Sequence, residues 1–282
     1  MKILSYTSLV RVVDPRYPTN LAILVLSILA GGVQFGFTIA QGSDLLTSLT
    51  NAIPIGLTVF LTWAVAREID PEHELSAFLG LALAIPGYYL FNPPDLMAVF
   101  MMLLLIRIIN RTTGISSRIL DSLVVSGLGL WLTYQGNWIY GFLTAAALLI
   151  DSRLPPPRNQ NLVFSMVITV FTFLIMIFLL EPITILGTIQ TPDFYLVLVM
   201  SILIIPLIIS TRRIELVCDF SPERVNPLRA QAGQIFTVTS LIIVWLLQGR
   251  EGIGNLFPIW SSVLALSLSY IFSLFLSRIW NR

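Results

Sequence analysis

Ten apolar segments, separated by short polar loops, limit what this chain can fold into. Segments of this kind are typical of helices that cross a bilayer, because a helix satisfies its backbone polar groups internally. Of the 282 residues, 56% are hydrophobic and 11% are charged, whereas soluble domains have about 25% charged residues. The segments lie at residues 21–40, 49–66, 76–91, 95–109, 118–134, 137–150, 162–181, 192–210, 230–248 and 256–277. We therefore expect an all-α, polytopic integral membrane helical bundle with about ten transmembrane helices.

The distribution of basic residues predicts which side of the membrane each loop faces. Fifteen of the sixteen Lys and Arg residues lie near the two ends of the chain or in every second loop between the segments, and only Arg250 lies in the other loops. Cytoplasmic loops are enriched in Lys and Arg. We therefore expect both termini in the cytoplasm and an even number of spans. The expected location is the plasma membrane of a prokaryote or an equivalent internal membrane.

The segments are expected to form a single transmembrane domain over residues 1–282. Several are short, and the region 118–150 is expected either to cross the membrane twice or to be re-entrant. A division near Asn137 would give halves 1–136 and 137–282 of opposite topology, as in inverted repeats, although the halves show no clear sequence similarity. The longest cytoplasmic loop is expected at residues 211–231.

Few residues are available for chemistry. The chain has one histidine, one lysine and one cysteine, namely His73, Lys2 and Cys218. Zinc sites with several histidines and an internal disulfide are therefore excluded, and the sequence has no Walker A motif or dinucleotide-binding glycine pattern. The net charge of +1 and the lack of a recognition motif predict no nucleic-acid partner. The expected partners are the lipid bilayer, a small-molecule or lipid substrate, and another membrane protein.

The loop REIDPEHE, after the second segment, places four carboxylates and the only histidine within seven residues. Asp70, Pro71 and Glu72 have the pattern of a helix start, in which Asp caps the helix and Pro takes its first position. Glu74 follows Asp70 by four residues, so both carboxylates can share a helix face and hold Mg²⁺ against a phosphate. The alternative is ion pairing with Arg67 or with nearby loop arginines. No cofactor is expected, except Mg²⁺ if the protein is an enzyme.

Gln34 is a polar residue inside the first apolar segment and is a candidate for a functional role. Gln34 is expected to bond across a helix interface or to line a cavity. Gly32 and Gly36, on the same segment, form a small-xxx-small pair that is expected to let a second helix approach closely.

Two arginines near the end of the fourth segment form a further candidate site. Arg107 and Arg111 share a helix face if this segment continues far enough. With the acids of residues 68–74 on the same predicted side, they can surround a lipid phosphate or pyrophosphate. The alternative is contact with anionic lipid by an ordinary basic loop.

Two positional similarities add little to this interpretation. REIDPEHE and IDSRLPPPR follow the second and sixth segments, where aromatic-prenylating membrane prenyltransferases carry acid-rich motifs, but the expected acidic spacing is missing and the second stretch has only Asp151. The length and span number are similar to those of ten-span metabolite exporters. We assign no family on these similarities.

Three classes of function are compatible with the sequence. The first is a permease or exporter for a small or lipid-like molecule, with a polar path at Gln34 and at spans interrupted by Pro54, Pro86 and Pro206. The second is a transferase-type membrane enzyme that acts on a lipid-linked phosphate or pyrophosphate at the cytoplasmic face. The third is an accessory subunit of a membrane complex. We expect the first, because no set of catalytic residues is complete. The candidate binding residues are Gln34, Arg67, Asp70, Glu72, Glu74, Arg107 and Arg111.

Overall fold

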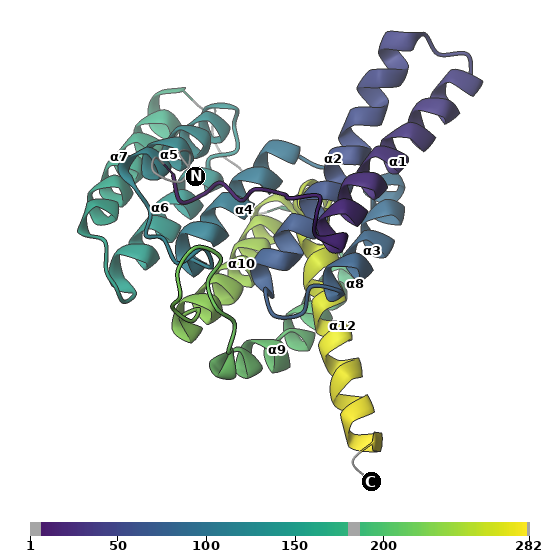
Figure 1. Cartoon of the computed structure of the whole chain (residues 1–282). Coiled ribbons are helices and arrows are strands. Elements are labelled where there is room, and N and C mark those ends of the chain that lie inside the picture. Colours follow the sequence, from purple (N-terminus) through teal and green to yellow (C-terminus); the bar gives the residue numbers. More distant parts are fainter. Residues whose placement is uncertain (1–6, 180–186, 281–282) are drawn as a thin grey trace. The chain divides into compact units, whose positions relative to one another are not determined.

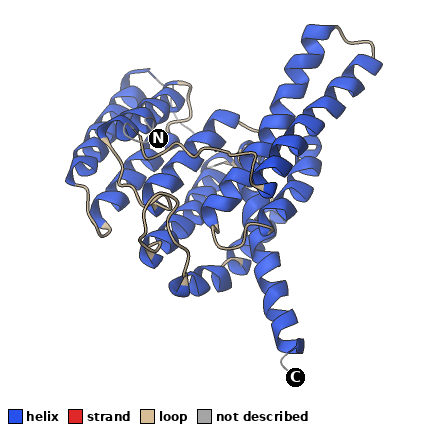
Figure 2. Ribbon diagram, viewed as in Figure 1, coloured by secondary structure: helices blue, strands red, loops and turns tan. Residues whose placement is uncertain are grey.

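The computed structural model describes residues 7–179 and 187–280, with side chains described as far as residue 277. In these ranges the regular secondary structure is helical, apart from an isolated β-bridge between Val217 and Arg224 (Figures 1 and 2). The helices are α1 (Pro18–Ala40), α2 (Leu45–Ile69), α3 (Ser76–Phe91), α4 (Leu96–Asn110), α5 (Ile119–Tyr134), α6 (Ile139–Arg153), α7 (Asn159–Leu179), α8 (Thr191–Leu203), α9 (Ile205–Ser210), η2 (Thr211–Arg213), α10 (Pro227–Gln248), α11 (Arg250–Asn255) and α12 (Phe257–Trp280).

Within the described residues, each of the ten predicted segments coincides with helical structure, and positions 180–181 of the seventh segment lie outside them. The eighth is divided into α8 and α9 next to Pro206, as expected where proline removes a backbone hydrogen bond. Six helices or helical runs within the described residues are long and apolar enough to cross a membrane, namely α1, α2, α7, the run Thr191–Arg213, α10 and α12. The apolar helices α3, α4 and α5 are shorter, and 16 residues rise only about 24 Å against a hydrocarbon thickness of about 30 Å. The six long helices indicate a membrane protein.

Helix α7 shows the inverted polarity of a helix that faces lipid. Its buried residues are Asn161, Ser165, Ile168 and Thr172, which follow one another at helical spacing and are mostly polar. Its exposed side is apolar. The exposed large side chains are Val163, Met166, Val167, Val170, Phe171, Phe173, Leu174, Ile177, Phe178 and Leu179. Such an exposed surface is far more apolar than that of a soluble protein, and a lipid environment accounts for it.

The chain is organised in two compact units that are interleaved along the sequence. The first consists of Met1–Arg11, Phe100–Asp193 and Ile208–Gly252, and we call it the α5–α7 unit. The second consists of Val12–Val99, Phe194–Leu207 and Ile253–Arg282, and we call it the α1–α3 unit. Residue 137 therefore lies inside the first unit.

In the α5–α7 unit, small residues let three helices pack closely (Figure 1). A Cβ added to Gly129 of α5 would lie 2.9 Å from the Cβ of Thr144 on α6. A Cβ added to Gly141 of α6 would lie 2.6 Å from the hydroxyl oxygen of Thr133 on α5. Neither glycine can carry a larger side chain without movement of its neighbour, so both set the distance between these helices.

In the α1–α3 unit, α1 and α2 form a hairpin, and α2 and α12 both pack on α3 (Figure 1). The expected close contact at Gly32 and Gly36 is wrong, because a Cβ at either position would meet nothing within 4 Å. The helices instead approach at Gly31, whose added Cβ would lie 3.2 Å from the backbone oxygen of Ala52. The contact is therefore made by a different glycine from the predicted pair, one residue away from Gly32.

Helix α10 begins earlier than the sequence analysis predicts. The loop expected at 211–231 starts with the short helix η2 and ends at Asn226. The side-chain oxygen of Asn226 accepts a hydrogen bond from the backbone N–H of Leu228 at 2.9 Å, and Pro227 takes the first helical position. Asn followed by Pro is a standard helix start, which the analysis of this loop overlooked.

Candidate functional site

A pocket of about 350 Å³ opens on the α1–α3 unit. Three consecutive helices form its walls, and all its lining residues except Tyr89 are hydrocarbon in character. They are Leu26, Leu29, Ala30 and Val33 of α1, Ile55 and Val59 of α2, and Phe78, Leu81, Ile85 and Tyr89 of α3. Ligand pockets in proteins have volumes of about 300–1,000 Å³ and are mostly apolar with a few polar groups, so this pocket is large enough for part of a lipid-like molecule.

Gln34 makes a hydrogen bond at the edge of this pocket. The hydroxyl of Tyr89 on α3 donates to the side-chain oxygen of Gln34 on α1, at 2.8 Å. This is the bond across a helix interface that was one of the two expectations for Gln34. The other expectation was that Gln34 lines a cavity. Val33 and Tyr89 line this pocket, whereas Gln34 is not among its lining residues.

Arg67 and Glu74 form an ion pair at the end of α2. Arg67 also donates to the side-chain oxygen of Asn20 on α1 at 3.2 Å, and its guanidinium carbon lies 5.2 Å from the ring centroid of Trp63. The hydroxyl of Thr19 donates to the second carboxylate oxygen of Glu74 at 3.2 Å. Ion pairing between Arg67 and Glu74, one of the two expectations for this loop, is therefore what the structure shows.

Asp70 does not start a helix, which corrects the interpretation of Asp70-Pro71-Glu72 as a helix signal. Helix α2 ends at Ile69, directly before Asp70, and α3 begins only at Ser76. The buried carboxylate of Asp70 instead contacts the Nδ1 atom of His73 at 3.0 Å, and this hydrogen bond raises the pKa of His73 above its ordinary value, against the opposing effect of partial burial. The side chain of Glu72 is exposed.

The carboxylates of this loop are therefore not arranged on one helix face. Asp70 and Glu74 both precede α3, and they have different partners, His73 and Arg67. Within the described part of the chain, no group of three or more His, Cys, Asp or Glu residues is placed to hold a metal ion. Mg²⁺ binding here stays a prediction of the enzyme alternative.

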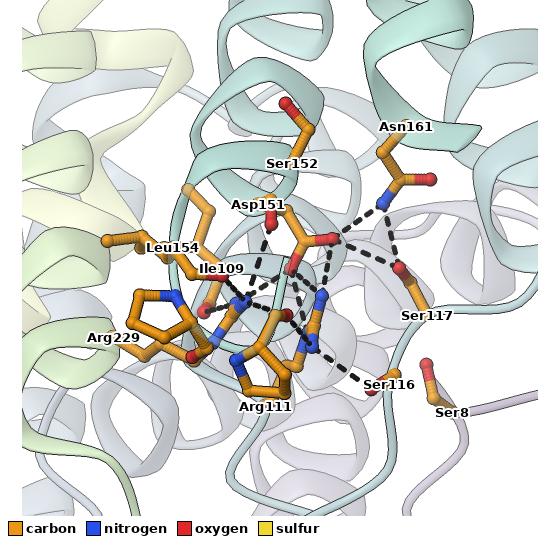
Figure 3. A network of polar contacts seen from close by, with 12 residues as sticks. Ser8, Ile109, Arg111, Ser116, Ser117, Asp151, Ser152, Leu154, Asn161 and Arg229 are labelled. Carbon is orange, nitrogen blue, oxygen red and sulfur yellow. Dashed lines mark hydrogen bonds and ion pairs between the residues drawn. The ribbon is translucent and has the colours of Figure 1, made fainter. Parts of the chain in front are cut away.

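The α5–α7 unit holds a second polar cluster, built around the fully buried carboxylate of Asp151 on α6. Arg111 donates to both carboxylate oxygens at 2.8 Å, through its Nε and Nη2 atoms. Arg229 of α10 donates to Oδ1 at 2.7 Å, and Ser117 and Asn161 donate to Oδ2 at 3.2 and 2.6 Å. Figure 3 shows both guanidinium groups directed at the same carboxylate. We call these five residues the Asp151 network.

Backbone carbonyls complete the hydrogen bonding of Arg229. Its guanidinium donates to the carbonyl oxygens of Pro155 at 2.8 Å, Ile109 at 3.0 Å, Pro156 at 3.0 Å and Leu154 at 2.6 Å (Figure 3). A buried charge is tolerated only when it is paired and hydrogen-bonded, and Arg229 meets both conditions. The network therefore fixes the loop after α6 to α4 and α10.

Arg107 and Arg111 do not share a helix face. Helix α4 ends at Asn110, and Arg111 follows with a φ of +50°, a left-handed conformation common after a helix end. Arg107 donates to the backbone oxygen of Leu9 at 2.9 Å. Both predicted phosphate ligands are thus in contact with other parts of the α5–α7 unit.

Residues 7–11 form a segment that we call the N-terminal strap. The buried carboxylate of Asp121 accepts hydrogen bonds from the hydroxyl of Thr7 and from the backbone N–H and hydroxyl of Ser8, at 2.9 and 2.7 Å for Ser8. At the other end of the strap, Arg11 pairs with Asp219 at 2.6 Å. The strap therefore joins the start of α5 to the loop before α10.

Sequence reasoning missed most of the Asp151 network. Asp151 was placed in a loop, and Asn161 and Arg229 were not considered as partners. One signal was available, namely that a single carboxylate ends the apolar run AAALLID in a chain with few acids. In membrane proteins, an acid within an apolar helix is expected to face the protein interior and to be paired.

Comparison of this chain with known protein families, with curated protein sequences and with solved structures found no match.

Proposed function

We propose that the protein is a multi-pass membrane permease that binds a lipid-like molecule in the pocket of the α1–α3 unit. In this proposal ten helices cross the membrane and both termini face the cytoplasm, as the placement of fifteen of the sixteen basic residues indicates. The observation that carries the proposal is the pocket itself, because it combines apolar walls on three helices with the Tyr89–Gln34 hydrogen bond at its edge.

Two prolines support a transport function for this pocket. Pro54 precedes the lining residue Ile55 on α2, and Pro86 follows the lining residue Ile85 on α3. Proline inside a helix removes one backbone hydrogen bond and weakens the helix locally. Two of the three walls therefore have a point at which they can bend, as transport through the pocket requires.

The other large polar cluster does not suit catalysis. The donors and acceptors of the Asp151 network are used by one another, and Asp151 and Arg229 are buried. A catalytic group must be able to reach its substrate. This favours the permease over the transferase.

Labelling with a photoreactive long-chain alcohol tests the proposal. In lipid nanodiscs, we expect the probe to crosslink to lining residues such as Leu81 and Tyr89. Ala30→Phe fills the pocket and is expected to lower labelling about tenfold, the equivalent of about 1.4 kcal/mol. Ile28→Phe is the matched control, because Ile28 is on the same helix and is 74% exposed.

The result must be read together with folding and transport. If folded Ala30→Phe protein is labelled as strongly as the wild type, the pocket is not the binding site. If the wild type binds the probe but proteoliposomes move no long-chain alcohol or acid between leaflets faster than empty vesicles, the protein binds lipid without being a permease.

A further inference from the structure

We infer that the α5–α7 unit carries a binding surface for the head groups of anionic phospholipids. The surface consists of the side chains of Arg118, Arg153, Arg158, Arg212, Arg213 and Arg224, and we call it the arginine surface. It is independent of the pocket in the α1–α3 unit, so the inference does not depend on the proposed transport function.

Among the described residues, these arginines differ from the others in the unit because their side chains have no ion pair within the protein. Arg118 is partly exposed and the remaining five are exposed. Among the described residues, none of the six has an ion pair or a side-chain hydrogen bond to another side chain. Arg111 and Arg229, by contrast, are committed to Asp151. The six guanidinium groups are therefore available to an external anion.

The sequence positions of these arginines place most of them where a helix leaves the apolar region. Arg118 directly precedes α5, Arg158 directly precedes α7, and Arg153 is the last residue of α6. Arg212 and Arg213 end the apolar run Thr191–Arg213. Basic residues at the ends of membrane helices lie at the depth of lipid head groups, where each contributes about a fivefold gain in binding to an anionic surface.

Hydrogen bonds between loops connect the loops that carry four of these arginines. The side-chain nitrogen of Asn226 donates to the carbonyl of Pro155 at 3.4 Å, which joins the loop of Arg224 to that of Arg153 and Arg158. The side-chain nitrogen of Gln160 donates to the carbonyl of Ser117 at 3.2 Å, next to Arg118. The three loops that carry Arg118, Arg153 with Arg158, and Arg224 are thus connected.

A second set of bonds fixes the loop before α10. The backbone N–H groups of Asp219 and Phe220 donate to the carbonyls of Thr112 and Thr113, at 3.2 and 3.1 Å. Within the loop, the N–H of Val225 donates to the carbonyl of Leu216 at 2.9 Å. A binding surface on fixed loops loses less conformational entropy on binding than one on mobile loops.

The charges around the arginine surface favour an anionic partner. The exposed acids on these loops are Glu215, Asp219 and Glu223, and Asp219 is already paired with Arg11. Among the described residues of these loops, six arginines without an ion pair therefore outnumber two exposed carboxylates without one, Glu215 and Glu223. Guanidinium binds phosphate through two parallel hydrogen bonds, which suits the phosphodiester of a lipid head group.

The test compares lipid binding by variants of the full chain. The protein is placed in nanodiscs of phosphatidylcholine, and binding of a fluorescent phosphatidylglycerol is measured at low and high salt. The triple variant R212Q/R213Q/R224Q is expected to bind about a hundredfold more weakly, or about fivefold for each arginine. Wild-type binding is expected to weaken at high salt.

Two control variants and one competitor keep the test decisive. R212K/R213K/R224K keeps the charge and is expected to keep most of the binding, and E215Q/E223Q removes the opposing charge and is expected to bind more tightly. Unchanged binding by a triple Gln variant that unfolds at the wild-type temperature would overturn the inference. So would tighter binding of a soluble acidic peptide than of phosphatidylglycerol, because the partner would then be a protein segment.

Discussion

The α5–α7 unit and the α1–α3 unit differ in how deeply their arginine–carboxylate pairs at Asp151 and at Glu74 are buried. In the first, Asp151 is 0% exposed and the side chains of Arg111 and Arg229 are 6% and 2% exposed. In the second, the Arg67–Glu74 pair is 20% and 44% exposed. The comparison teaches that the α5–α7 unit fixes its helices through a buried ionic network, whereas the Arg67–Glu74 pair of the α1–α3 unit stays near water.

The largest expected effect comes from removing the buried carboxylate. Asp151→Asn leaves two buried guanidinium groups without their anion, and we expect a loss of about 3–5 kcal/mol in the free energy of unfolding. Thermal unfolding in detergent measures the change, with Glu215→Gln as an exposed control. If both variants unfold at the same temperature, the network does not stabilise the unit and the contrast between the units fails.

Two glycine substitutions on α5 test how tightly the α5–α7 unit is packed. Gly129→Ala forces a Cβ against Thr144 and is expected to cost about 1–3 kcal/mol by overpacking. Gly127→Ala on the same helix meets nothing within 4 Å and is expected to gain up to about 1 kcal/mol in helix propensity. Opposite shifts in Tm confirm the packing of α5 on α6, and equal shifts contradict it.

The Arg67–Glu74 ion pair of the α1–α3 unit is expected to contribute less to the free energy of unfolding than the Asp151 network. Arg67→Gln is expected to change the free energy of unfolding by no more than about 1 kcal/mol, because the Arg67–Glu74 pair is partly exposed and solvent screens it in part. The same unfolding assay applies, and Arg16→Gln serves as a control on an exposed arginine of this unit. A loss as large as that of Asp151→Asn would mean that both units depend equally on their ions.

The smallest effect on stability is expected from titration of His73 as the pH changes. Because Asp70 raises the pKa of His73 in the folded protein, this contact stabilises the fold fully below the unfolded pKa of about 6.5. The stabilisation is lost as the pH rises through the higher folded pKa. His73→Gln should remove this part of the pH dependence of Tm. If the two proteins show the same pH profile across that range, the contact with Asp70 does not hold in solution.

The sequence predicted the positions of the helices better than it predicted the contacts between them. Long apolar runs and prolines such as Pro206 depend on local rules, so the helical segments could be located. The partners of Asp151 could not, because Arg111 and Arg229 come from other helices and only the fold brings them together. The glycine contact was missed by one residue because the pattern GGVQFG offers several small faces and the sequence does not say which one meets α2.

The N-terminal strap makes the order of synthesis matter. Ser8 is made before its partner Asp121, which follows 113 residues later, and Arg11 is made before Asp219, which lies 208 residues further along. While the intervening helices are being inserted, Ser8 and Arg11 both lack their final contacts with Asp121 and Asp219. The strap can therefore complete its contacts only after both Asp121 and Asp219 have been synthesised, and a ribosome that stalls before Asp219 leaves the Arg11 contact unformed.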